Sequence, residues 1–382
     1  MKLTVLLILC FTLCSCRYMG GLPVEERAIV QAAAIDLSDN GYKITLQLNK
    51  TGGGTGIPSD DPVAPDSITV SGEGKTLPEA FGEINSGQNK GKDIFFGQTR
   101  YFILSEKLLT QKGSGDFLSF MRSKIYSIPN SYVLAAKENS ASEIVEENAK
   151  NSILPDDHIE NNLKHLIKEG YINQNRLLDM FKDEFNKAGC AIIPVIHKAQ
   201  GSGSEEQAGI KLQIGGAAVL RRGMLTGFLS EQELRGIVWA QGSFENTMLS
   251  VKDGEISLTL LPKRSRSEIS ISDKKIDITV KSTSNARVSR LTESPPYNTS
   301  DTANTESPPA IVAFYAEKEI SLMIKTALEK CIYEYKINPF KLSDVRLYGK
   351  KREWNRLARD WDEYTEKINL SVIAKVNVET IR

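Results

Sequence analysis

An apolar run near the start of the chain, Leu3 to Leu13, leads to a cysteine at position 16, and this arrangement removes the first sixteen residues from any folded core. Lys2 gives the run a short basic start, and the small residue Ser15 stands directly before Cys16, as at the exit of a secretory signal. A membrane-spanning helix needs about 20 apolar residues. The run of eleven residues is therefore too short for a permanent anchor.

The end of this signal has the pattern of bacterial lipoproteins, with a leucine three places before a cysteine and a small residue directly before it. In such proteins the cysteine thiol receives a diacylglycerol and becomes the mature N-terminus. Cys16 fits better than Cys14, because the bulky Leu13 precedes Cys14. We therefore predict a signal peptide over residues 1–16 with lipidation at Cys16. The alternatives are a plain signal peptide or an uncleaved start with three chance cysteines.

Length and charge restrict the class of protein. The chain has 382 residues, which is enough for two or three domains of about 100–200 residues. Basic and acidic residues balance at 48 each, so no nucleic-acid partner is expected. No stretch after Cys16 is apolar for long enough to cross a bilayer. Two cysteines follow, Cys190 and Cys331, and we favour two buried thiols over a disulfide between them.

Alternating strands and capped helices predict an N-terminal α+β domain over residues 17–150. Asn40-Gly41 lies between the apolar segments Ala28–Asp36 and Tyr42–Leu48 and indicates a β-hairpin. Thr76 to Glu79 has the spacing of a helix capping box, and Asp93–Leu104 reads as one central strand. We expect Asp116 to cap a further helix.

A helical middle domain is expected over residues 151–209 and a C-terminal domain over 210–382. In the latter, Ser230 to Glu233 forms a second capping box. Strands are expected at 255–261, 267–271, 275–281 and 368–378, and a mobile insertion at 282–309. Glu317–Tyr335 repeats apolar residues with the helical period. The predicted fold class is multi-domain α+β, with mixed and antiparallel sheets, packed helices and a long amphipathic helix near the C-terminus.

Tests for chemistry identify no catalytic, cofactor or metal residue. The three histidines, His158, His165 and His197, lie in no hydrolase or zinc motif. The paired carboxylates at 60–61 and 156–157 neighbour prolines in expected loops, and Trp354 and Trp361 read as core residues. We therefore expect a binding or structural protein and no enzyme.

The order of segments resembles a known family, the Ger(x)C proteins. The segments that carry this resemblance are the lipoprotein signal, Ala28–Asp36 with Tyr42–Leu48, Gly74–Ala80, Gly91–Gly97, Phe102–Glu106, Ala218–Leu220, Leu225–Leu229, Glu233, Gly236, Trp239, Gly242, the long helix, and the ending with Trp354, Trp361 and Ile368–Val378. They extend over essentially the whole chain. Ger(x)C proteins are the C subunits of nutrient germinant receptors in spore-forming bacteria.

The resemblance implies a three-domain, non-enzymatic lipoprotein on the outer face of the spore's inner membrane or of the bacterial cell membrane. It implies assembly with two integral membrane receptor subunits, one of them similar to amino-acid transporters. Together these subunits would respond to nutrients and trigger germination. The family brings no catalytic or ligand site that could be carried over to this chain.

Two other functions are weighed against this one. The first is a solute-binding lipoprotein of a transport system, which needs two lobes of strands and helices around a cleft. The expected meander and single long helix of the second half argue against it. The second is a surface-anchored hydrolase, which the missing motifs disfavour.

Overall fold

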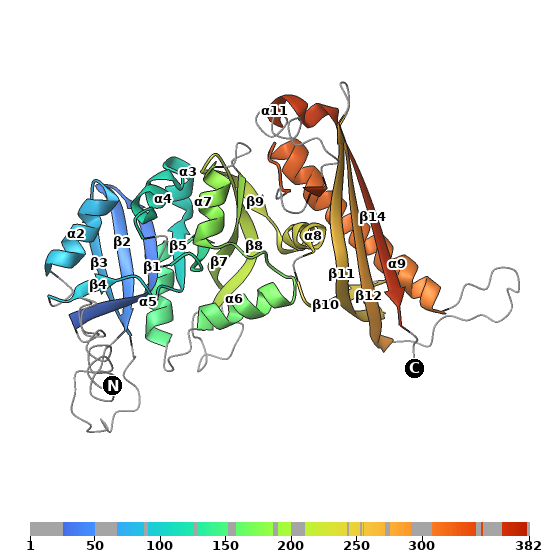
Figure 1. Ribbon diagram of the computed structural model, residues 1–382. Coiled ribbons are helices and arrows are strands. Elements are labelled where there is room, and N and C mark those ends of the chain that lie inside the picture. Colours follow the sequence, from blue (N-terminus) through green and yellow to red (C-terminus); the bar gives the residue numbers. More distant parts are fainter. Residues whose placement is uncertain are drawn as a thin grey trace, which may run out of the picture.

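The computed structural model describes residues 26–49, 67–87, 91–124, 128–151, 158–185, 190–199, 211–242, 244–252, 254, 256–271, 276–291, 308–340, 345–346 and 361–379. Figure 1 shows two β-sheets that stand side by side, with helix α8 (Glu231–Gln241) between them. The mixture of helices and strands confirms the predicted α+β class.

The first sheet has nine strands. They are β1 (Arg27–Ser38), β2 (Gly41–Asn49), β3 (Ser67–Gly74), β4 (Asp93–Phe95), β5 (Tyr101–Ser105), β6 (Tyr132–Ala136), β7 (Cys190–Ala199), β8 (Lys211–Arg221) and β9 (Met224–Leu229). Their order is β3-β2-β1-β5-β6-β7-β8-β9, and β4 also pairs with β1. The middle pairs, from β1 to β7, are parallel, whereas both outer ends of the sheet are antiparallel.

Helices cover both faces of this sheet. One face packs against α5 (Ala141–Asn151), α6 (His158–Lys168) and α8, and the other against α2 (Leu77–Gly87), α3 (Glu106–Gln111), α4 (Gly115–Met121) and α7 (Leu177–Phe185). Side chains alternate across a strand. In β5, Tyr101 and Ile103 therefore join the first core, and Phe102 and Leu104 join the second. This double covering explains why β5 is buried throughout and apolar from Tyr101 to Leu104.

The second sheet has one helix-covered face. Its strands are β10 (Thr247–Val251), β11 (Ile256–Ile271), β12 (Ile276–Leu291), β13 (Val345–Arg346) and β14 (Ile368–Val378). The helical elements are α9 (Pro308–Glu329), the π-helical turn η4 (Lys330–Glu334), α11 (Trp361–Tyr364) and the 3-10 turn η5 (Thr365–Lys367). Ile276, Ile278 and Val280 of β12 are buried, whereas Asp277 and Lys281 between and beyond them are at least partly exposed. The sheet is antiparallel from β10 to β12, and β14 pairs with β12 in parallel.

Two local predictions are confirmed at the level of hydrogen bonds. Ser38 pairs with Gly41, so the predicted hairpin forms, with Asp39 and Asn40 as its loop and Gly41 as the first residue of β2. At the start of α8, the hydroxyl of Ser230 accepts a hydrogen bond from the N–H of Glu233 at 3.3 Å, and the Glu233 carboxylate accepts one from the N–H of Ser230 at 2.7 Å. The predicted capping box therefore forms in full.

The expected single strand Asp93–Leu104 is wrong, because a turn divides it into β4 and β5. In this turn the N–H of Thr99 donates to the Phe96 carbonyl at 2.8 Å, and the Thr99 hydroxyl donates to the Val30 carbonyl at 3.3 Å. Both short strands pair with β1 at successive positions along it. The apolar residues that were predicted to form one strand therefore belong to two strands, β4 and β5.

The expected cap of α4 is also corrected. The helix begins at Gly115 after Ser114, so Asp116 lies in its first turn. Its carboxylate instead accepts a hydrogen bond from the Tyr42 hydroxyl, which links α4 to β2. Burial of the phenol, followed by this hydrogen bond and the Asp116 charge, raises the pKa of Tyr42 to about 12.

The insertion expected at 282–309 is narrower than predicted. Residues 282–291 form the second half of β12 and pair with β11 and β14, and residues 308–309 begin α9. The buried positions in this half strand are Ser282, Ser284 and Ala286, whose small side chains hid the alternating pattern. Similarly, the strands expected at 255–261 and 267–271 belong to one strand, β11, in so far as they are described: residues 256–261 and 267–271 are both part of it, and its register is irregular after Pro262. Residues 292–307 lie outside the described residues.

The first sheet runs without a break across residues 150 and 210, where domain boundaries were expected. Strand β7 and helices α6 and α7 from the expected middle domain pack into this sheet, as do β8 and β9 from the expected C-terminal domain. The division of the chain into independently folding units stays a prediction.

Candidate functional site at the junction of the two sheets

Helix α8 joins the two sheets and meets α9 at Gly236. A Cβ atom at Gly236 would lie 2.3 Å from the carbonyl oxygen of Met323 and 2.7 Å from the Cβ of Ala327. Both distances are far below the usual carbon contact distance of about 3.5–4.0 Å. Only glycine therefore allows the two helices to approach this closely.

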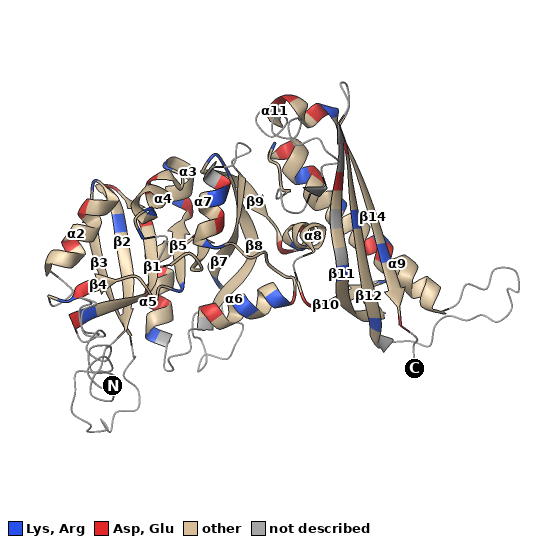
Figure 2. Cartoon of the chain, in the orientation of Figure 1, with Lys and Arg blue, Asp and Glu red and all other residues tan. Residues whose placement is uncertain are grey.

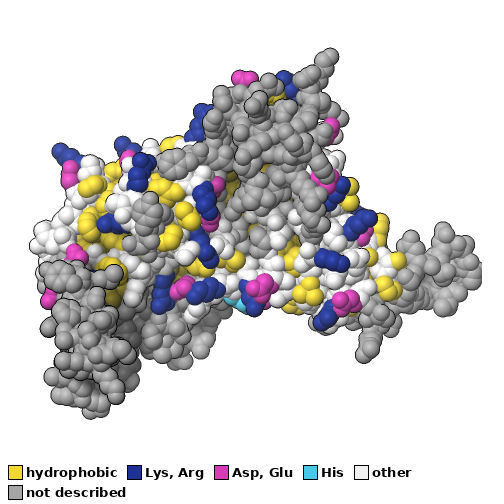
Figure 3. All heavy atoms as spheres, in the orientation of Figure 1, with side chains coloured by type: hydrophobic (Ala, Val, Ile, Leu, Met, Phe, Trp, Pro, Cys, Tyr) yellow, Lys and Arg dark blue, Asp and Glu magenta, His cyan; other side chains and the backbone are white. Residues whose placement is uncertain are grey.

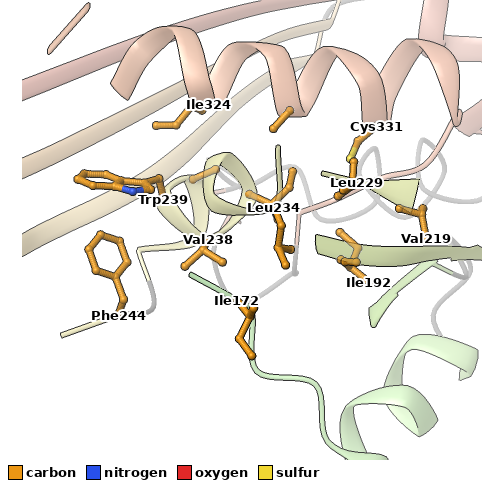
Figure 4. Packing of buried hydrophobic residues seen from close by; sticks show 14 of the residues in the cluster. Ile172, Ile192, Val219, Leu229, Leu234, Val238, Trp239, Phe244, Ile324 and Cys331 are labelled. Carbon is orange, nitrogen blue, oxygen red and sulfur yellow. The ribbon is translucent and has the colours of Figure 1, made fainter. Parts of the chain in front are cut away.

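The apolar side of this junction is buried and tightly packed. The ring of Trp239 is 1% exposed and packs on Phe244, with ring centroids 4.8 Å apart. Figure 4 shows Trp239 and Leu234 of α8 next to α9 and the strands of the first sheet. Ile324 and Cys331 point toward α8 from α9 and η4. One hydrophobic cluster thus extends from the first sheet through α8 into the second sheet.

The polar side of the junction is built on Glu233 and Lys330. The ammonium of Lys330 in η4 donates to both carboxylate oxygens of Glu233 in α8, each at 2.9 Å. The two side chains are only 23% and 19% exposed. The same Glu233 carboxylate closes the capping box of α8. One carboxylate therefore fixes the start of α8 and attaches it to the end of α9.

The protonation states of this pair follow from their contacts. Burial alone would raise the pKa of Glu233, but hydrogen bonds from the Ser230 N–H and from Lys330 outweigh it and lower the pKa below its ordinary value. Burial would likewise lower the pKa of Lys330, but the Glu233 carboxylate outweighs it and raises that pKa. Both groups are therefore charged at neutral pH, and each stabilises the charged form of the other.

Residues of η4 and just beyond also contact the backbone of β9. The Lys330 ammonium donates to the carbonyl of Phe228 at 3.2 Å, and the Tyr335 hydroxyl donates to the same carbonyl at 2.8 Å. A Cβ atom at Gly227 would lie 2.7 Å from the Tyr335 ring, so this contact also requires glycine. The end of the long helix is thus fastened directly to the first sheet.

The geometry of this helix end is unusual. The turn η4 is π-helical, a conformation that is rare and frequently found at functional sites. Lys336 follows with a positive φ of 52°, which L-residues seldom adopt. An open groove of about 530 Å³ lies beside the ion pair and is lined by Glu233, Thr326, Glu329, Lys330, Tyr333 and Glu334. The residues that line this groove include no histidine or cysteine. The ion pair and the groove therefore join α8 and η4 without offering an activated nucleophile.

Cys331 and Cys190 lie at the same junction as free thiols. Burial raises the pKa of Cys331 to about 12, with a further contribution from Glu233. Burial also raises the pKa of Cys190 well above its ordinary value, and the Cys331 thiol and Asp183 add to this. Thiols react through their thiolate forms. Both cysteines therefore act as packing residues.

A second polar arrangement positions α5 on the first sheet. The carboxylate of Asp36, at the end of the first strand of the hairpin, accepts hydrogen bonds from the N–H groups of Ala141 and Ser142, each at 2.8 Å. Burial raises the pKa of Asp36 although both hydrogen bonds lower it. Further along α5, the buried Asn148 amide donates to the Tyr101 hydroxyl at 3.0 Å and to Gln47 at 3.3 Å. Both ends of α5 are thus attached to the sheet.

Several residues singled out in the sequence lie outside the described residues, namely Cys16, the carboxylate pairs at 60–61 and 156–157, and Trp354. Trp361 is 4% exposed and belongs to the core, as predicted. Nε2 of His165 lies 3.4 Å from Glu169 on an exposed side of α6. Among the described residues, no group of three or more histidine, cysteine or acidic side chains is arranged to hold a metal ion.

The sequence predicted the capping role of Glu233 but not its ion pair with Lys330. Its capping function was visible because the partner, Ser230, is three residues away. Its ion-pair partner Lys330 is separated by 97 residues, and no local pattern reports such a contact. Asp36 was noted only as the end of a strand, and its contact with α5 spans 105 residues.

No helix in the described parts of the chain is both long and apolar enough to cross a membrane. The sequence matches the family description "Spore germination protein N-terminal domain" over residues 21–198. It also matches "Spore germination B3/ GerAC like, C-terminal" over residues 215–382.

A curated relative and a solved structure resemble the chain over nearly its whole length. The chain is 24% identical to spore germination protein B3 of Bacillus subtilis (strain 168) over 374 residues, covering 95% of this chain and 92% of that protein. The crystal structure of the GerBC protein has a TM-score of 0.51 at 18% identity and covers 91% of this chain and 97% of that chain, which shows a shared fold. The two family descriptions account for both halves of the sequence, and the chain therefore belongs to the Ger(x)C family of spore germination proteins.

Proposed function

We propose that this protein is the lipid-anchored C subunit of a spore germinant receptor and that it acts through protein–protein interaction. The observation that carries this proposal is the match to both family segments. The pattern of residues before Cys16, which predicts a lipoprotein signal, supports it. The name of the Bacillus subtilis relative supports a role in germination. The junction described above favours a structural role, because its charged groups are engaged with one another.

In this proposal the bilayer anchor is the acylated Cys16. Each buried methylene contributes about 0.8 kcal/mol, and two acyl chains are enough for stable attachment. The protein would then lie on the outer face of the spore's inner membrane, where two integral membrane subunits, one of them transporter-like, would be its partners. The nine residues 17–25 separate the anchor from the described fold.

The anchor is tested by Cys16→Ala in the full chain, followed by separation of membrane and soluble fractions. We expect release of the variant from the membrane, because the apolar run is too short to span it. Cys14→Ala is the matched control and should stay in the membrane fraction with its lipid. Retention of Cys16→Ala without acylation would contradict the proposed anchor.

The partners are tested by co-purification from spore membranes after mild detergent extraction. We expect two multi-spanning proteins to accompany the chain, and loss of the gene to impair the response to some nutrients while growth stays normal. Recovery of a transporter ATPase together with normal germination would instead favour the solute-binding alternative.

A further inference from the structure

The first turns of α9 form an uncharged and partly exposed helix end. Residues 308–316 (PPAIVAFYA) contain no charged side chain, and in Figure 2 this end of α9 is tan throughout. Ile311 and Phe314 are 36% and 59% exposed, and Leu322 further along is 56% exposed. Exposed apolar side chains that gather on one surface mark a contact with lipid or protein.

These side chains lie on the outer side of α9. Ile311, Phe314 and Leu322 follow one another at intervals of three and eight residues, which places them on one stripe of the helix. Val312 and Ile320 lie on the opposite, buried side and pack into the junction cluster. On the outer stripe, the ring of Phe314 makes an edge contact with the ring of Tyr315, with centroids 5.7 Å apart, and the rest of its surface faces outward.

The position of the first turn of α9 relative to the N-terminus indicates which surface this end of the helix contacts. In Figure 1 the first turn of α9 and the start of β1 both lie along the lower edge of the molecule, and Figure 3 shows hydrophobic side chains at the surface there. Residues 17–25 connect β1 to Cys16, and an extended stretch of that length spans at most about 32 Å. An anchored molecule therefore has its lower edge within reach of the bilayer.

We propose that the first turns of α9 insert Ile311 and Phe314 into the headgroup region of the bilayer that holds Cys16. This inference rests on the proposed lipid anchor and adds a second membrane contact to it. A helix end without charges can enter this region without dehydrating an ion. Lys318, one turn after Phe314, can extend its ammonium to the lipid phosphates. Lipid is favoured over a protein partner because the short tether to Cys16 would hold this edge of the molecule close to the bilayer.

The experiment places an environment-sensitive fluorophore at the tip of α9, which comprises residues 308–316. Phe314→Cys is labelled in the full chain, purified from membranes and reconstituted into vesicles of phosphatidylcholine and phosphatidylglycerol. Met224→Cys, at a position 39% exposed in the turn beside Ser114, is the matched control. We expect a blue shift of the emission and loss of quenching by iodide at residue 314 and not at residue 224. A further change, Ile311→Asp, should reverse both effects.

A second arm separates this inference from the anchor itself. A chain that starts at residue 17 with an N-terminal histidine tag is tethered to vesicles that contain nickel-chelating lipid, so it reports on the tip even if Cys16 carries no lipid. An unshifted, fully quenched label in both arms would overturn the inference and leave the anchor intact. A shift that occurs only in native spore membranes would also overturn it, because the tip would then contact a protein.

Discussion

The substitution Gly236→Ala tests whether the close contact between α8 and α9 holds the two sheets together. The added methyl group would lie 2.3 Å from a backbone carbonyl oxygen and 2.7 Å from the Cβ of Ala327. A backbone carbonyl inside a helix cannot move aside, so the helices must separate. Overpacking of this kind costs about 1–3 kcal/mol, which exceeds the gain of about 1 kcal/mol for alanine over glycine in a helix. We expect a net loss of up to about 2 kcal/mol.

The measurement is urea unfolding followed by circular dichroism and by the fluorescence of Trp239, which lies at this junction. The midpoint should fall by up to about 1 M at a slope of about 2 kcal/mol/M. Gly82→Ala is the matched control, because it lies in α2 with nothing within 4 Å of the added methyl group. It should stabilise by about 0.5–1 kcal/mol. The reasoning fails if Gly236→Ala is as stable as the control, since the two helices would then not be in close contact.

Three further predictions concern single polar groups. Lys330→Met should lower the free energy of unfolding by about 1–2 kcal/mol at pH 7. Because the pKa of Glu233 is lowered in the fold, this difference should persist above pH 4.5, its ordinary value, and shrink as the pH falls through the folded value; a difference independent of pH would exclude the ion pair as its cause. Asp36→Ala should cost about 2 kcal/mol, because two buried N–H groups lose their acceptor, with Asp36→Asn less affected; hydrogen exchange at the start of α5 measures the loss. Cys331, with a pKa of about 12, should react with a thiol reagent at pH 8 only after unfolding; rapid reaction of the native chain would show that the junction is open.

The sequence allowed local structure to be predicted where short-range contacts determine it. The Asn-Gly hairpin, the Ser230 capping box and the final strand each depend on residues close together in the chain, and all three form. The predictions failed where the structure of a segment depends on partners that are distant in the sequence. Residues 282–291 form a strand only because β11 and β14 flank them, and the continuity of the first sheet past residue 210 depends on the pairing of β7 with β8.

The same limit explains why the junction was invisible in the sequence. Gly236 was noted as a family feature, but the reason for glycine there is a carbonyl 87 positions later. Glu233 and Lys330 are ordinary helix residues until the fold brings them together. A pattern that repeats every two or 3.6 residues reports which side of an element is buried and not which element buries it.

The contacts made by β14, the outer strand of the second sheet, support the proposal that the exposed first turns of α9 contact the membrane. Strand β14 is at the edge of its sheet, and an open edge invites pairing with another chain. Along this edge the N–H of Val376 donates to Glu317 at 2.9 Å and that of Ala374 donates to Ser321 at 3.3 Å, both on α9. Near the other end of the strand, the Tyr333 hydroxyl donates to the Ile368 carbonyl at 3.0 Å. Because these side chains occupy the edge of β14, strand addition there is disfavoured, and the outer stripe of α9 is what the helix still offers for contact. The uncharged first turns of α9, residues 308–316, lie at the edge of the molecule from which the tether leaves and are suited to a lipid surface.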